Sequence, residues 1–184
     1  VMIGYVAGAI IQILQYLSSA EQLKMFTLWS MGSLSHITTT QLGIMIPIVC
    51  IGLLISISCI KSLNLLLLGE NYARTMGMNI KRSRTLIFVS TALLTGTVTA
   101  FCGPVAFIGL AVPHIARMVL RTANHNSLLP VTILSGGAVA LLCNLICVLP
   151  GEAGIIPLNA VTPIIGAPVI IYVIVSQRGP QHFN

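Results

Sequence analysis

Long apolar runs alternate with short polar segments along the whole chain. An α-helix needs about 20 apolar residues to cross a bilayer, and somewhat fewer where neighbouring helices shorten the path. Cys102-Gly103-Pro104 interrupts one long apolar stretch, because proline has no N–H to donate and clashes with the preceding helical turn. The pattern predicts an all-α, polytopic transmembrane helix bundle with five to six membrane helices, at residues 1–17, 41–60, 86–101, 105–120, 128–149 and 160–176.

The composition agrees with a lipid bilayer as the surroundings of this chain. Hydrophobic residues make up 56% of the 184 and charged residues only 7%, whereas about a quarter of the residues of a soluble domain are charged. The net charge of +6 is not the signature of a nucleic-acid-binding protein, because the basic residues fall in short clusters between apolar runs. The first apolar run opens the chain without an initiator methionine, so we expect a piece of a longer protein.

The basic residues also predict an orientation in the membrane. Placing successive loops on alternating sides puts Lys24 alone on one side. The other basic residues fall on the opposite side: Lys61, Arg74, Lys81, Arg82, Arg84, Arg117, Arg121 and Arg178. Because lysine and arginine concentrate in cytoplasmic loops, this second side is expected to be the cytoplasm, with the loops at 18–40 and 150–159 outside. We therefore expect a multi-pass membrane protein with most of its basic residues on the cytoplasmic side.

Acidic groups inside the membrane are nearly absent, and this bears on the transport mechanism. Glu21, Glu70 and Glu152 all lie in predicted loops, and the chain has no aspartate. A proton-coupled carrier would have no buried carboxylate to protonate. A sodium-coupled secondary transporter stays open as the alternative, since hydroxyls such as that of Thr97 and freed carbonyls can bind Na⁺. More often such a hydroxyl bonds to a carbonyl one turn back.

No enzymatic or metal-binding motif is recognisable. The chain has no phosphate-binding loop, nucleophile elbow or His-Glu-x-x-His motif, so ATP hydrolysis is not expected here. Cys143 and Cys147 are four residues apart, but a metal site would need further ligands at a suitable spacing. We interpret them as core cysteines, which pack like small apolar residues. No cofactor or metal is predicted.

The polar segment 64–84 is too polar to cross the membrane and too patterned for an idle linker. Its apolar residues can lie along one face of a helix or helix pair, interrupted at Gly69 and Gly77. We predict a cytoplasmic coupling loop at 61–85. Periodicity alone leaves two interpretations open, a docking element for a partner protein and an interfacial helix on lipid headgroups.

From this segment onward the chain resembles the permease family of ABC importers for iron-siderophores, haem and cobalamin. Four signatures carry the resemblance, in order and correctly spaced: Gly69-Glu70-x2-Ala73-x2-Met76-Gly77; Gly103-Pro104-Val105-Ala106-Phe107-Ile108-Gly109-Leu110-x2-Pro113-His114-x2-Arg117; His125-x2-Leu128-Leu129-Pro130; and Gly166-Ala167-Pro168. One departure is at 155–159, where the usual Glu-x-Pro-x-Gly ends in Asn159.

The resemblance implies a transport subunit of roughly ten membrane-crossing helices, of which this chain would be the C-terminal half. In that family two permease subunits surround a pathway, ABC ATPase subunits bind the cytoplasmic face, and an extracytoplasmic binding protein delivers substrate. The first signature would enter a cleft of the ATPase: Gly69 and Gly77 as turns, Tyr72 and Met76 in the cleft, and Glu70 and Arg74 as orienting charges. The first and last helices and the turn at 103–109 would line the pathway.

Overall fold

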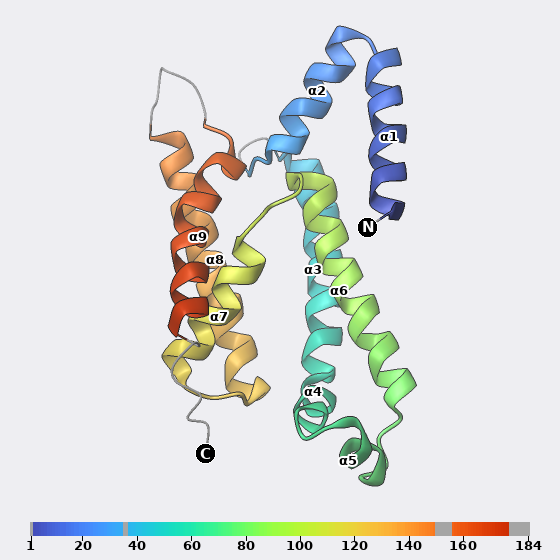
Figure 1. Ribbon diagram of the computed structural model, residues 1–184, viewed down its shortest axis with the longest axis vertical. Helices are drawn as coiled ribbons and strands as arrows, with labels where there is room; N and C mark the ends of the chain where they lie inside the picture. The colour runs from blue at the N-terminus through green and yellow to red at the C-terminus, as the bar shows by residue number, and fades with distance from the viewer. Residues whose placement is uncertain (1, 35–36, 150–155, 177–184) are drawn as a thin grey trace.

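The computed structural model describes residues 2–34, 37–149 and 156–176, and within these ranges every regular element is an α-helix. The all-α prediction is confirmed. The helices are α1 (Met2–Leu17), α2 (Ala20–Met31), α3 (Thr39–Ser58), α4 (Ile60–Leu67), α5 (Glu70–Thr75), α6 (Ile80–Cys102), α7 (Ile108–Leu120), α8 (His125–Val148) and α9 (Leu158–Ser176). They form two groups, with α3 and α6 in one and α7, α8 and α9 in the other (Figure 1).

Helices α3 and α6 pack closely through small and hydroxyl side chains. A Cβ at Gly52 would lie 2.8 Å from the side chain of Leu94, so only glycine lets the two helices approach this far. Next to this contact, the Ser90 hydroxyl donates to the Gly52 carbonyl at 3.0 Å and lies 2.5 Å from the Ser56 hydroxyl. Hydrogen bonds of this kind stabilise helix pairs where lipid provides no hydrophobic driving force between them.

The second group has a small apolar core between α8 and α9. Cys143 and Cys147 are buried there against Leu158 and Val161. The interpretation of both cysteines as core residues is confirmed. Within the described residues, no three His, Cys, Asp or Glu side chains are grouped closely enough to hold a metal ion.

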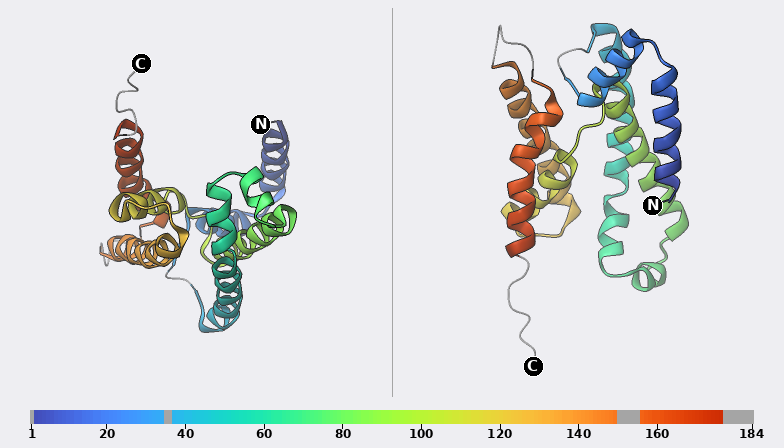
Figure 2. Two further views of the ribbon diagram at one scale, coloured as in Figure 1. Left: turned by 90° about the horizontal axis from the view of Figure 1, so that it is seen from below. Right: turned by 45° about the horizontal axis from the view of Figure 1, so that its top comes forward.

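The two groups are joined at both ends of the molecule. Helix α4 contacts the start of α8 at one end, and α2 contacts α9 at the other (Figure 2). Helices α4 and α5, the start of α6 and the end of α7 all lie at the first end (Figure 1), and they carry the basic residues from Lys61 to Arg121. Lys24 lies on α2 at the opposite end. Glu152 and Arg178 fall outside the described residues.

The predicted spans agree with the structure in number and differ in length. Three helices, α3, α6 and α8, are long and apolar enough to cross a membrane, whereas the apolar helices 2–17, 108–120 and 158–173 are shorter. Helix α1 contributes no buried residue. Because most of its side chains are apolar, with Gln12 and Gln15 as exceptions, they favour lipid or further protein as surroundings over water.

Two helix boundaries differ from the sequence prediction. In both cases a polar side chain caps the first turn of the helix. The predicted outer loop at 18–40 contains α2, whose first turn is fixed by a capping box between Ser19 and Gln22. Helix α6 starts at Ile80 rather than at residue 86, because Asn79 caps it by accepting a hydrogen bond from the Arg82 amide. The predicted coupling loop at 61–85 is thus largely helical.

Candidate functional site

The first signature forms a short helix held between two glycines. Gly69 precedes α5 with φ +101°, and Gly77 follows it with φ +80°, a conformation that L side chains rarely adopt. The end of α5 is a Schellman motif, in which the Met78 amide donates to the Ala73 carbonyl and the Gly77 amide to the Arg74 carbonyl. The predicted break at both glycines is confirmed, and both breaks arise from their backbone angles.

Helix α5 and the residues just before and after it present apolar side chains outward at the end of the molecule. Leu68, Tyr72 and Met76 are 64%, 48% and 61% exposed, and we call these three residues the coupling surface. Ala73, on the same helix, is fully buried and fastens it to the rest of the chain. An anchored helix with exposed large apolar side chains is typical of a protein interaction site.

The charges of this segment include an ion pair that the sequence did not predict. Glu70 pairs with Arg84 at the start of α6. Both partners are about half exposed, with 52% and 54% of their side-chain surface accessible. Arg84 was not among the predicted site residues, and the only signal for it was its place in the basic cluster after Gly77.

The second signature forms the turn between α6 and α7 at the opposite end. Gly103 caps α6 with φ +80°, and a Cβ there would lie 2.1 Å from the Trp29 carbonyl. Pro104 follows it as an exposed residue. Phe107 begins α7 with φ +68°, which is uncommon for a residue other than glycine and is a form of backbone strain often found at functional sites.

The structure brings the second and fourth signatures together. Gly166 of α9 is buried, and a Cβ there would lie 2.7 Å from the Phe107 Cβ. Pro168, two residues further along, is exposed. Four predicted site residues remain in α7. A Cβ added at Gly109 would meet no neighbouring atom, and Pro113 and His114 are half-buried. Arg117 is exposed in the last turn. Arg117 lies at the same end of the molecule as α5. The signature residues therefore form two sets, one at the end with α5 and one at the opposite end with the turn between α6 and α7.

Asn159 joins three segments at the outer end and was missed as a site residue. Its Nδ2 donates to the carbonyls of Ser30 at 3.2 Å and Pro104 at 2.6 Å. Its Oδ1 accepts from the Ala106 amide at 3.2 Å. The carboxamide therefore ties the end of α2, the α6–α7 turn and the start of α9 together. The signal in the sequence was the departure from glycine at this position.

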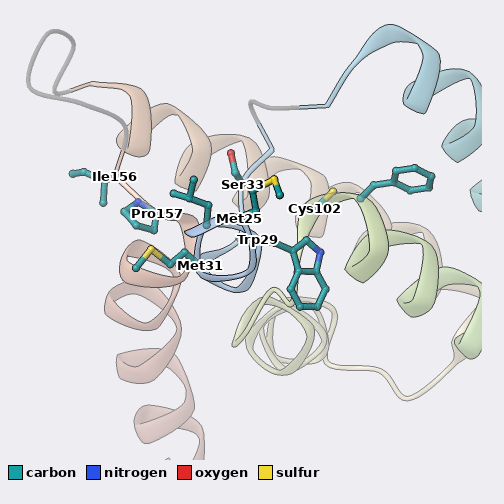
Figure 3. A pocket seen from close by; sticks show the side chains of 10 residues that line it. Met25, Trp29, Met31, Ser33, Cys102, Ile156 and Pro157 are labelled. Carbon is teal, nitrogen blue, oxygen red and sulfur yellow. The ribbon is translucent and has the colours of Figure 1, made fainter. Parts of the chain in front are cut away.

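An apolar cavity of about 340 Å³ lies beside this junction, between α2, the end of α6 and residues 156–157 (Figure 3). Trp29 lines it from α2, and the indole N–H donates to the Ala100 carbonyl at 3.4 Å. Met25 and Met31 lie on the same helix, with Cys102 and Pro157 on the other walls. The cavity and the coupling surface lie at opposite ends of the molecule in space.

Comparison with known proteins identifies relatives over nearly the whole chain. Residues 1–176 match the FecCD transport family. The hemin transport system permease protein of Yersinia pestis is 34% identical over 97% of this chain. The vitamin B12 import system permease protein of Klebsiella pneumoniae is also 34% identical over 97%. This chain covers 53% and 54% of those two proteins, about half of their length.

A solved structure supports the same arrangement of helices. An inward-facing ABC transporter assigned to the metal-chelate type superposes with a TM-score of 0.79 at 29% identity. The superposition covers 95% of this chain and 56% of that one. The fold is therefore that of an ABC permease, and the family match lends no support to the sodium-coupled alternative.

Proposed function

The chain belongs to the FecCD transport family, and from that premise we propose that it is the C-terminal half of an importer permease driven by a separate ATPase. Its helices would form part of the translocation pathway for an iron chelate, haem or a cobalamin-type substrate, in agreement with the substrates that its relatives are named for. The family match and the apolar helices make it a membrane protein. We place it in the bacterial cytoplasmic membrane.

The observation that carries this proposal is the coupling surface. Leu68, Tyr72 and Met76 are exposed beside a helix that Ala73 and two positive-φ glycines hold in a defined position. This surface lies at the end with most of the positive charge, which the positive-inside rule assigns to the cytoplasm. A short helix with exposed apolar and charged side chains suits insertion into a cleft of an ATPase subunit.

The other partners follow from the same family. We propose a second permease subunit, giving a homodimer around the pathway, and an extracytoplasmic binding protein at the end that carries α2 and the cavity beside Trp29. The first helix, the last helix and the turn at 103–109 would face the pathway. No catalytic group is assigned to this chain, because ATP hydrolysis would belong to the partner subunit.

Replacement of Met76 by aspartate in the complete permease tests the docking assignment. Burying a carboxylate in an apolar cleft is costly, so M76D should lose the ATPase on co-purification and reduce uptake by about ten-fold or more. The permease should still insert in normal amounts. Met25→Asp is the matched control for insertion and for ATPase co-purification, since Met25 is similarly exposed, at 64%, but lies on α2 at the opposite end. Retention of the ATPase and of uptake by M76D would contradict the assignment.

A further inference from the structure

A polar junction connects α4 to the start of α8. Asn64 lies in the middle of α4 and uses both ends of its carboxamide. Its Nδ2 donates to Asn124 Oδ1 at 3.0 Å. Its Oδ1 accepts from the His125 amide at 2.8 Å and lies 2.9 Å from His125 Nδ1. Because a carboxamide oxygen can only accept, Nδ1 carries the proton in this contact.

These bonds complete the N-terminal cap of α8. The first amides of a helix have no partner within the helix. Asn124 is the N-cap residue and accepts from the Asn126 amide at 3.0 Å. The His125 amide, which Asn124 does not reach, is satisfied by Asn64. Helix α4 thus supplies part of the cap of α8 from about 60 residues earlier in the sequence.

Helix α4 is also fastened to α6 and to the coupling surface. The Ser83 hydroxyl of α6 donates to Ser62 of α4 at 3.2 Å. Helix α5 follows α4 directly through Leu68 and Gly69, and Glu70 pairs with Arg84 of α6. In the part of the chain that the structure describes, the hydrogen bonds of Asn64 are those that join the two helix groups at this end.

Helix α8 in turn packs against both other helices of its group. Gly136 of α8 lies beside Val112 of α7, 3.7 Å from a Cβ placed at the glycine, and Cys143 lies against Val161 of α9. A movement of the start of α8 is therefore a movement of a packed unit, since packed interiors transmit displacement. The turn at 103–109 leads into α7, and α9 is the last helix. We assign both the turn and the last helix to the pathway.

We propose that Asn64 is a positioning residue for energy coupling, which transmits the movement of α4 and α5 to helix α8 through its hydrogen bonds to Asn124 and His125. The inference rests on the proposed function, because it takes the ATPase to act on the coupling surface. It adds a defined route from that surface to the second helix group. Asn64 touches neither the ATPase nor the substrate in this role.

Asn64→Leu in the complete permease, reconstituted with its ATPase and binding protein, tests the route. Leucine has the same branching at Cγ and the same number of heavy atoms, and it removes all three hydrogen bonds. ATPase co-purification and basal ATP hydrolysis should be unchanged, whereas ATP-driven uptake should fall about ten-fold, within the usual range of coupling between sites. Asn124→Asp is the matched control. It keeps the two acceptor bonds of this side chain, from Asn64 and from the Asn126 amide, and should transport normally.

A distance measurement separates coupling from a general loss of structure. Spin labels at Lys81 on α6 and Ser127 on α8 should report an ATP-dependent change in the wild type and in N124D, but not in N64L. Normal uptake by N64L, or an unaltered ATP-dependent distance change in it, would overturn the proposal. A parallel fall of uptake and basal hydrolysis in N64L would also overturn it, because that pattern indicates a structural role.

Failure of this inference can be told apart from failure of the docking assignment. If M76D loses the ATPase while N64L transports normally, the coupling surface stands and the route through Asn64 is wrong. If M76D keeps both ATPase and uptake, the coupling surface itself is wrong, and the inference falls with it whatever N64L does.

Discussion

The Asn159 side chain donates a hydrogen bond to the Pro104 carbonyl at 2.6 Å, which links the start of α9 to the turn between α6 and α7. The same carboxamide bonds to Ser30 and Ala106, so three segments depend on one side chain. The outer end of the second helix group is therefore held by these polar contacts together with the apolar cluster around Cys147 and Leu158.

Asn159→Leu should destabilise the protein through the loss of these contacts. Leaving backbone groups without partners costs about 1–3 kcal/mol, and we expect a decrease of that size in the free energy of unfolding, measured by denaturant titration in detergent micelles. Asn71→Leu at an exposed position of α5 is the control and should change it by about 0.5 kcal/mol or less. An unchanged stability of Asn159→Leu would show that water replaces these contacts without cost.

The glycines of the signatures should differ sharply in their tolerance of alanine. Gly103→Ala would place a Cβ 2.1 Å from the Trp29 carbonyl in a left-handed backbone conformation, so we expect loss of folded protein on size-exclusion chromatography. Gly109→Ala meets open space within α7 and should be neutral or stabilise the helix by about 1 kcal/mol. Equal behaviour of the two variants would contradict the geometry of the turn.

This contrast shows how far sequence reasoning reaches here. The resemblance gave Gly103 and Gly109 of the second signature and Gly166 of the fourth without distinguishing their packing, because a motif records residue types and not distances. The structure separates them, since Gly103 and Gly166 meet neighbouring atoms at once and Gly109 does not. The apolar pattern predicted every long helix, because burial in lipid depends on composition. It missed α2, whose helical start depends on a local cap.

The polar junctions could not be predicted for a related reason. Asn64 and Asn124 are 60 positions apart, and Asn159 is 55 positions from Pro104. No local period connects such pairs, and each asparagine taken alone fits a cap or a turn equally well. The short segment that carries the coupling surface was predictable because its residues lie within nine consecutive positions, from Leu68 to Met76, whereas Glu70 and Arg84 are 14 positions apart and no local pattern connects them.

The Glu70–Arg84 ion pair should contribute little to stability. Both side chains are about half exposed, and exposed pairs contribute about 0–1 kcal/mol because water and salt screen them. Glu70→Gln should therefore leave the free energy of unfolding within about 1 kcal/mol of the wild type. Arg84→Gln should behave alike, and the double variant should show little coupling in a double-mutant cycle. A larger effect on uptake than on stability would assign Glu70 to the contact with the ATPase.

Thr162 of α9 carries the one buried side-chain polar atom without a hydrogen-bond partner among the described residues. It is 1% exposed and borders a cavity of about 20 Å³ near Val112 and Cys143. Thr162→Val keeps the shape and removes the unpaired hydroxyl, so it should stabilise the protein by about 1 kcal/mol in the same denaturant titration.

Thr97→Val is the matched control for this prediction. The Thr97 hydroxyl is also buried but donates to the Leu93 carbonyl at 2.6 Å, as expected for a hydroxyl in a membrane helix. Its replacement removes a made hydrogen bond and should destabilise by about 0.5–1.5 kcal/mol. The two substitutions are chemically identical, but they should change the free energy of unfolding in opposite directions. A destabilised Thr162→Val would instead indicate that the small cavity holds a water molecule bonded to the hydroxyl, since a cavity of this size can accommodate one.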